Sequence, residues 1–185
     1  MRKSPELRGK TNGRSREVAA LLAAARAVLE NRAFADAAKA ILGACKTILG
    51  ANAGFVAVYA AGGKDLEVAC LDPGSLEFTS AAGLPAQLRH LCARAYKLGR
   101  VVVANDLAKS APQASAAGDH AALDSALVAP VIIAGDVAGL LCLINRPGGF
   151  SAADSQLIEV FAEMAAVAML NSRTVNGLVK NRNGL

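Results

Sequence analysis

The sequence predicts an α+β domain in which a central antiparallel sheet is covered on one face by helices from both ends of the chain. Two β-rich stretches, residues 54–71 and 125–145, each contain a short glycine turn, and consecutive hairpins give antiparallel strands. Apolar residues recur at helical spacing in residues 17–50 and again from residue 151 onward. These terminal helices are expected to cover one face of the sheet.

The first helical region is predicted to form two helices. One apolar stripe lies in residues 18–29 and a second in residues 37–49, with a break at Asn31 and Arg32. Gly50 is the expected C-cap of the second helix. The preceding residues, 1–16, are polar and lack periodicity, which predicts a basic, disordered tail.

The middle of the chain alternates between strand and helix patterns. The segments "GFVAVYA" and "LEVACL", joined by "AGGKD", predict a hairpin. Residues 84–98 return to helical spacing until Gly99 stops them, and "RVVVA" predicts a short strand. Residues 107–123 are small and polar, and they predict a long loop of the kind that often carries function.

The C-terminal part is predicted to be a hairpin followed by a helix. Residues 125–133 and 137–145 form two strands joined by "AGD". Pro130 has no N–H to donate, so a bulge or an unpaired side is expected there. Ser151, with Asp154 three residues later, resembles a capping box and predicts the start of the last helix.

The net charge of +5 is concentrated in one segment. Residues 1–16 hold six basic side chains and one acidic side chain, so the rest of the chain is neutral. A nucleic-acid-binding domain would carry its basic residues on a folded face, often among aromatic side chains. No apolar run reaches the roughly 18 residues of a membrane span. Neither nucleic acid nor a membrane is therefore an expected partner.

The four cysteines are widely separated, without a Cys-x-x-Cys motif or a nearby histidine pair, which argues against a zinc site. Each lies in an apolar periodic segment, the usual setting of a buried thiol. The basic N-terminus leads into a helical pattern and not into the apolar stretch of a secretory signal. A cytoplasmic location is therefore expected.

The last helix carries a heptad-like repeat over about three heptads. Its members recur at alternating spacings of four and three: Leu157, Phe161, Met164, Ala168, Asn171, Val175 and Leu178. The first half is expected to pack on the sheet. The second half, together with residues 18–29, is expected to meet another subunit, and an asparagine at a core position favours a parallel homodimer.

The stretch "LVAPVIIAGDVAGLLCLINRPGGFSAADSQLIEVFAEMAAVAM" resembles the C-terminal half of a GAF domain. That family has a hairpin, Asn-Lys, a short linker, Phe, three residues, and Asp-Glu opening the last helix. Asn145, Phe150 and Asp154 match this pattern, while Arg146 replaces the lysine and Ser155 replaces the glutamate. Upstream, "AYKLGRVVVANDLAKS" and "GDHAALDSALVAPV" are similar to GAF domains of bacterial sensor proteins.

The resemblance implies a single GAF domain over residues 17–175, followed by a tail or helix extension over 176–185. Its fold would be profilin-like, with an antiparallel sheet of about six strands and both terminal helices on one face. The helix at 85–98 and the loop at 105–124 would cover the other face and enclose a small-molecule pocket.

The expected ligand-binding residues lie at the two ends of this covering loop: Asn105, Asp106, His120, Asp124 and Ser125. Convergent polar groups in a concave apolar site are what a ligand pocket needs. The alternative is that Asn105 and Asp106 are a turn pair bonded to their own backbone and that His120 is solvated.

The motif residues Asn145, Arg146, Phe150 and Asp154 have expected structural roles. Asn145 ends the strand, and Phe150 fills the gap between sheet and helix. Arg146 and Asp154 are predicted to form an ion pair across the bend, with Asp154 also favoured by the helix dipole.

These observations predict a non-catalytic sensor or regulatory domain of bacterial signal transduction, with a small-molecule ligand of unknown identity. Its expected partners are a second copy of the chain and an output signalling protein or domain. The sequence leaves the cofactor unknown, and no metal site is expected. Two alternatives remain open: a ligand-free dimerisation scaffold, and an enzyme that reduces free methionine sulfoxide with reactive cysteines, for which no exposed thiol is apparent.

Overall fold

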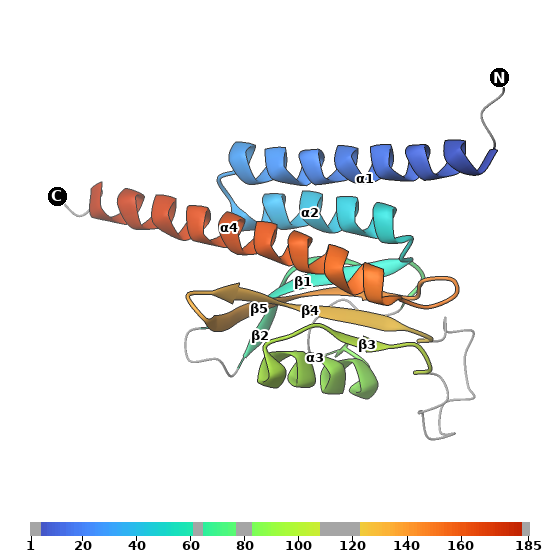
Figure 1. Cartoon of the computed structure of the whole chain (residues 1–185). Helices are drawn as coiled ribbons and strands as arrows, with labels where there is room; N and C mark the ends of the chain where they lie inside the picture. The colour runs from blue at the N-terminus through green and yellow to red at the C-terminus, as the bar shows by residue number, and fades with distance from the viewer. Residues whose placement is uncertain (1–4, 61–64, 77–82, 108–122, 183–185) are drawn as a thin grey trace.

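The computed structural model describes residues 5–60, 65–76, 83–107 and 123–182, and within these the side chains of residues 15–174 (Figure 1). The described residues form four helices and one five-stranded antiparallel sheet in the order β2-β1-β5-β4-β3. The strands are β1 (Ala53–Tyr59), β2 (Leu66–Asp72), β3 (Val102–Ala104), β4 (Ala126–Ile133) and β5 (Asp136–Ile144). The helices are α1 (Pro5–Glu30), α2 (Phe34–Leu49), α3 (Ala86–Leu98) and α4 (Ala152–Arg182).

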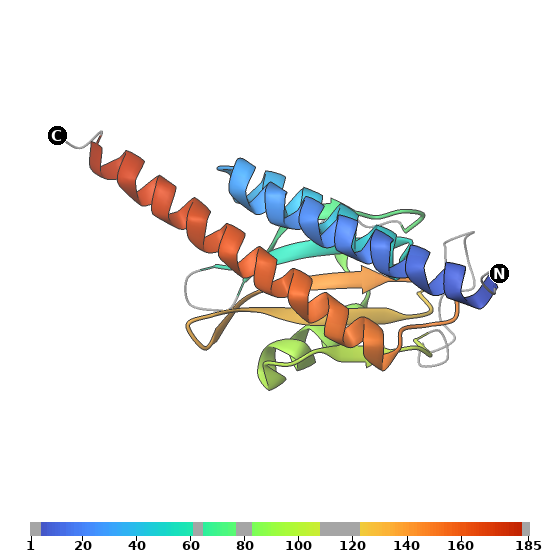
Figure 2. The same ribbon diagram turned by 45° about the horizontal axis from the view of Figure 1, so that its top comes forward.

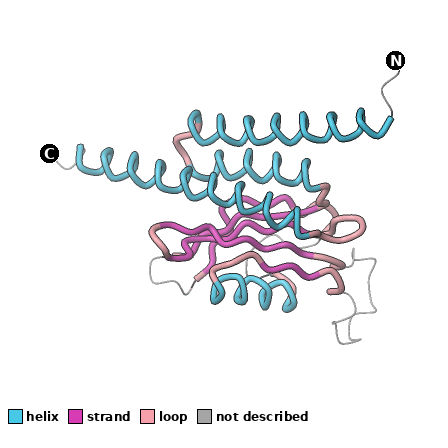
Figure 3. The backbone as a smooth tube through the Cα atoms, in the orientation of Figure 1, coloured by secondary structure: helices cyan, strands magenta, loops and turns pink. Residues whose placement is uncertain are grey.

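The helices form layers on the two faces of the sheet (Figures 1 and 3). Helices α2 and α4 pack on one face, and α1 lies on α2 and α4 as an outer layer. Helix α3 packs on the opposite face. The α+β fold class and the placement of the terminal helices are therefore confirmed.

Each face of the sheet has its own apolar core because the side chains of successive strand residues point to opposite faces. On the α2–α4 face, Ile41 and Phe161 are fully buried in one cluster. On the α3 face, Phe55 and Leu88 are fully buried in a second cluster. Gly54 allows α2 to approach closely, because a Cβ there would lie 2.9 Å from the Leu42 Cδ1 atom.

The hairpin between β4 and β5 has the two-residue turn predicted from "AGD". Ala134 and Gly135 have φ angles of +53° and +91°, as a type I′ turn requires. The expected irregularity near Pro130 is also confirmed, because the register shifts between Val131 and Ile132. Pairing of β4 with β3 ends at Val128, so among the described residues Pro130 has a strand partner on the β5 side only.

Helix α1 begins much earlier than the sequence analysis expected. It starts at Pro5, so residues 5–16 are helical and are not the irregular tail predicted for residues 1–16. Extending an existing helix costs little once its nucleus is formed, and residues 18–29 can supply that nucleus. The prediction failed because it relied on apolar periodicity, which residues 5–16 lack and which residues 18–29 of the same helix have.

The heptad-like residues of α4 face inward over the first half of the helix, as expected. Phe161 and Ala168 are buried, and Leu157 and Met164 pack partly against the same core. Asn171 is exposed. The side chains of Val175 and Leu178 lie outside the described residues. None of the described helices combines the length and the apolar character that crossing a membrane requires.

Candidate functional site: a polar pocket at one end of the sheet

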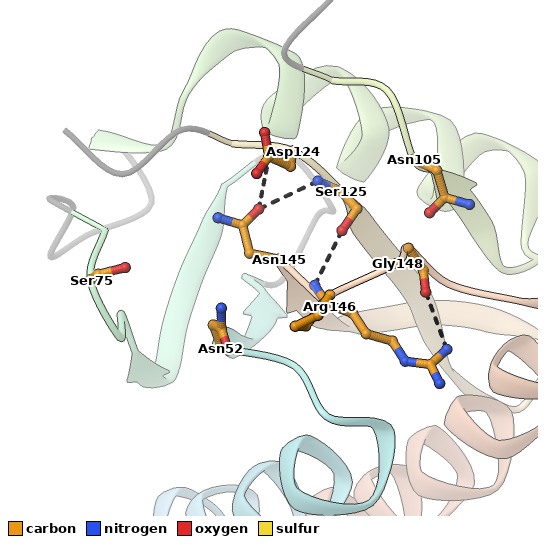
Figure 4. A pocket seen from close by; sticks show the side chains of 10 residues that line it. Asn52, Ser75, Asn105, Asp124, Ser125, Asn145, Arg146 and Gly148 are labelled. Carbon is orange, nitrogen blue, oxygen red and sulfur yellow. Dashed lines mark hydrogen bonds between the residues drawn. The ribbon is translucent and has the colours of Figure 1, made fainter.

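A pocket of about 480 Å³ lies at the end of the sheet where β1 and β4 begin and β2 and β5 end (Figure 4). Polar side chains from several elements meet there because antiparallel strands alternate their beginnings and ends along one edge. We call this the polar pocket; it is lined by Asn52, Ser75, Asn105, Asp124, Ser125 and residues 145–149 of the β5–α4 linker.

Three of the five residues predicted to bind a ligand line the polar pocket: Asn105, Asp124 and Ser125. Asp106 is adjacent to Asn105 in the chain and is exposed, but it does not line this pocket. His120 lies outside the described residues. Two lining residues, Asn52 and Ser75, were missed because neither lies in a recognisable motif.

Asn105 connects the end of β3 to the β5–α4 linker. Its Nδ2 atom donates a hydrogen bond to the Phe150 carbonyl oxygen at 2.9 Å, and its Oδ1 atom accepts one from the Phe150 N–H at 2.8 Å. Gly149 lies directly against this amide group, because a Cβ on Gly149 would be 2.8 Å from the Asn105 Cγ atom. The side chain of Asn105 therefore fixes the backbone that leads into α4.

Asn145 joins the end of β5 to the start of β4. Its backbone is left-handed, with a φ angle of +54°, a conformation that asparagine adopts more readily than most residues. Its Oδ1 atom accepts hydrogen bonds from the Asp124 N–H at 2.9 Å and the Ser125 N–H at 3.4 Å. The Ser125 hydroxyl in turn accepts from the Arg146 N–H at 3.2 Å. Asn145 thus does more than end the strand.

The predicted ion pair between Arg146 and Asp154 is present. Arg146 Nη1 also donates to the Gly149 carbonyl oxygen at 3.2 Å. Asp154 is buried and accepts from the Ser151 N–H at 2.6 Å, while the Asp154 N–H donates to the Ser151 hydroxyl at 3.3 Å. This reciprocal arrangement is the predicted capping box, and it holds the first turn of α4 against the linker. Phe150 is buried, as expected.

The four cysteines lie outside the polar pocket, and burial raises the pKa of every thiol. The pKa of Cys92 is raised to about 12, and that of the fully buried Cys142 lies well above its usual value. Cys70 is half-buried, and its pKa is also raised although Lys39 partly opposes the shift. No group of three or more potential metal ligands occurs among the described residues.

A second pocket, of about 410 Å³, lies between α4 and the part of β4 that β3 does not pair with. Its lining includes Arg100, Pro130, Glu159 and Glu163. None of the residues predicted to bind a ligand is among the described residues that line it.

A protein-family model described as GAF domain matches residues 31–170, which is more than half of the chain. No curated protein matched the chain. Among solved structures, the chain resembles free methionine-R-sulfoxide reductase from Neisseria meningitidis in complex with its substrate, with 19% identity, a TM-score of 0.66 and coverage of 84% of this chain and 89% of that chain.

Two other similar structures are part of a chemotaxis protein and the GAF domain of a phosphotransferase. A methyl-accepting chemotaxis protein has 16% identity, a TM-score of 0.64 and coverage of 84% of this chain and 98% of that chain. The GAF domain of a phosphoenolpyruvate-protein phosphotransferase from Coxiella burnetii has 13% identity, a TM-score of 0.66 and coverage of 88% and 98%. At these identities the likeness establishes the fold. Together with the family match, it means that the chain belongs to the GAF domain family.

Proposed function

We propose that this chain is a non-catalytic regulatory GAF domain of bacterial signal transduction, which binds a small molecule in the polar pocket and transmits occupancy through α4. The observation that supports this most is the bonding of the linker that lines the pocket. Asn105, at the end of β3, and Asp124, at the start of β4, are both hydrogen-bonded to it. The same linker continues into the capped start of α4.

The proposed mechanism is a shift between two packings of α4. A ligand that contacts the linker and the ends of β3 and β4 stabilises the packing to which it binds more tightly. The Arg146–Asp154 ion pair and the capping box then carry that preference to the first turn of the helix. An output protein or domain in the cytoplasm would respond to the position of α4.

We also propose that α1 and α4 pair with those of a second copy in a parallel homodimer. Both helices present large apolar side chains to solvent at helical spacing: Val18, Leu22 and Leu29 on α1, and Val160, Val167 and Leu170 on α4. Figure 2 shows α1 and α4 running across the helical side of the molecule, at an angle to each other. Helices with exposed apolar stripes of this kind commonly associate.

The dimer is tested by analytical ultracentrifugation of Val167→Glu beside the parent protein. Val167 is 49% exposed, so the substitution leaves the monomer fold intact and disrupts only an interface that buries it. Gln156→Glu, an exposed position outside the apolar stripe, is the matched control. A dimeric parent and control with a monomeric variant supports the interface. A monomeric parent at tens of micromolar contradicts it.

The ligand-binding function is tested by thermal shift with a panel of small metabolites. A ligand that binds the folded state raises the melting temperature as its concentration rises. Asn52→Ala combined with Ser75→Ala is expected to abolish the shift while leaving the ligand-free melting temperature unchanged, because neither side chain has a partner among the described residues. A shift that survives in this variant contradicts binding at the polar pocket.

The two alternatives predict different results. A dimerisation scaffold would pair as proposed but would show no ligand-dependent stabilisation. An enzyme reducing free methionine sulfoxide would need a reactive thiol, whereas burial raises the pKa of all four cysteines. Turnover of free methionine sulfoxide that is lost on replacement of one cysteine would contradict the non-catalytic function.

A further inference from the structure

We infer that the ligand of the polar pocket carries a protonated amine, as a cation or a zwitterion, and is not an anion such as a phosphate or a dicarboxylate. This inference rests on the proposed function, since it names the class of molecule that the pocket binds. It follows from which charged and polar groups around the pocket already have partners and which do not.

The positive charge at the pocket already has a partner. Among the described residues that line the pocket, Arg146 is the only basic one. Its guanidinium group pairs with Asp154 and also donates to the Gly149 carbonyl oxygen, so it faces away from the pocket centre toward α4 (Figure 4). An anionic ligand would have to compete with the buried Asp154 carboxylate for this cation. Breaking such a pair leaves a buried charge without its counterion, which is costly.

Among the described residues, the negative charge at the pocket has no such partner. Asp124 is held by its backbone, because its N–H donates to Asn145 Oδ1 at 2.9 Å and its carbonyl oxygen accepts from the Leu107 N–H at 3.0 Å. Its carboxylate has no hydrogen bond or ion pair with any of the described residues. The position of Asp124 is therefore fixed while its charged group remains available to a ligand.

Two neutral polar groups accompany this carboxylate. Asn52 is held by its backbone N–H, which donates to the Ile144 and Asn145 carbonyl oxygens at 3.1 Å each. Figure 4 shows the Asn52 amide and the Ser75 hydroxyl directed into the space beside Asn145. Both groups can donate and accept hydrogen bonds without adding charge. They suit the hydroxyl, carbonyl or amide groups of a small polar molecule.

The paired cation, the available carboxylate and the two neutral polar groups together define the ligand class. An ammonium group can form a charge-assisted hydrogen bond with Asp124, while the rest of the molecule bonds to Asn52 and Ser75. A phosphate or dicarboxylate would instead place negative charge near Asp124, with no unpaired cation among the described lining residues to offset it. A volume of about 480 Å³ is within the usual range for small-molecule pockets.

The test compares probes that share one side-chain skeleton and differ in the charge of their backbone groups. L-Serinamide is a cation, L-serine a zwitterion and N-acetyl-L-serine an anion, and the corresponding three forms of L-glutamine provide a longer skeleton. Dissociation constants are measured for the intact chain by calorimetry or by ligand-dependent thermal shift. We expect the cation to bind roughly tenfold more tightly than the anion on at least one skeleton, with the difference shrinking as salt is added.

Two variants identify the carboxylate responsible. Asp124→Asn is expected to reduce the preference for the cation to within about twofold, because Asp124 is exposed and its backbone bonds are retained. Asp136→Asn makes the same charge change at the opposite end of β5 and is expected to leave the preference intact. Loss of preference in both variants would contradict a specific role of Asp124.

The outcomes separate this inference from the proposed function. Saturable binding of the anionic probes, equal to or tighter than that of the cations, overturns the amine preference but leaves ligand binding in place. Failure of every probe to bind at millimolar concentration overturns both. Preferential binding of the cations in the parent and in Asp136→Asn, but not in Asp124→Asn, supports both.

Discussion

Replacement of Gly149 by alanine tests whether the contact between Asn105 and the β5–α4 linker stabilises the fold. Gly149 has a φ angle of +78°, and a Cβ there would lie 2.8 Å from both the Asn105 Cγ and Oδ1 atoms. Gly148 is a matched control, because its φ angle is +82° but a Cβ there would meet nothing within 4 Å. Both variants place an alanine at a positive φ angle, but only Gly149→Ala also brings a Cβ into the Asn105 side chain.

The two costs can be estimated separately. Holding an alanine in the left-handed region costs about 1–2 kcal/mol, and this should be the whole effect of Gly148→Ala. Gly149→Ala must in addition displace the Asn105 amide, which loses two hydrogen bonds to Phe150 worth about 1 kcal/mol each. Its expected cost is therefore about 3–4 kcal/mol in the free energy of unfolding.

Urea denaturation measures the free energy of unfolding of each variant. The set comprises the two glycine variants, Asn105→Ala and the double variant Gly149→Ala/Asn105→Ala. In the absence of the Asn105 side chain there is nothing to displace, so the two substitutions should be non-additive by about 2 kcal/mol. Equal costs for Gly148→Ala and Gly149→Ala, or additive costs in the double variant, would refute the reasoning.

Other predictions concern the β-turn, an ion pair and the thiols. Ala134→Gly should raise the free energy of unfolding by about 0.5–1 kcal/mol, because Ala134 has a φ angle of +53° in the type I′ turn. The hydrogen bond from Lys46 lowers the pKa of Asp72, so this pair stabilises the fold above the unfolded-state pKa and ceases to do so as pH falls through the lower folded value. Asp72→Asn should therefore cost up to about 0.5 kcal/mol at neutral pH, since the side chain is half-exposed, and in an acid denaturation series the difference from the parent should vanish once the pH falls below the lowered folded-state pKa. In thiol labelling of the native protein, Cys70 should react first and Cys142 only through unfolding, and fast labelling of Cys142 would contradict its burial.

The sequence was most informative where neighbouring residues decide the structure. The turn in "AGD", the capping box at Ser151 and the Arg146–Asp154 ion pair depend on residues no more than eight positions apart. The turn and the capping box follow from spacing and residue type, and the ion pair was expected from the GAF-like motif, so all three could be predicted before any tertiary structure was known. Local patterns predicted five strands and the resemblance implied about six, and five occur among the described residues.

The sequence was least informative where distant segments meet. Asn105 and Phe150 are 45 positions apart. No local pattern indicates that the Asn105 side-chain amide would bond both the N–H and the carbonyl oxygen of Phe150. Asn52 and Ser75 reach the polar pocket only because β1 and β2 pair in a particular register. Residues 5–16 were mispredicted for a different reason: they lack the apolar periodicity on which the prediction relied, and they extend a helix whose apolar stripe lies in residues 18–29.

Because α4 is long, a small change of its angle at one end gives a large displacement at the other end. Its 31 residues span about 46 Å, whereas the nine residues of β5 span about 30 Å. The last buried side chain described on this helix is that of Ser172, so the remaining turns project past the sheet (Figure 2). A tilt of only about 5° at the capped end near Asp154 would therefore displace the far end by about 4 Å. A rearrangement too small to disturb the sheet would thus become a movement the size of a side chain at the other end of the molecule.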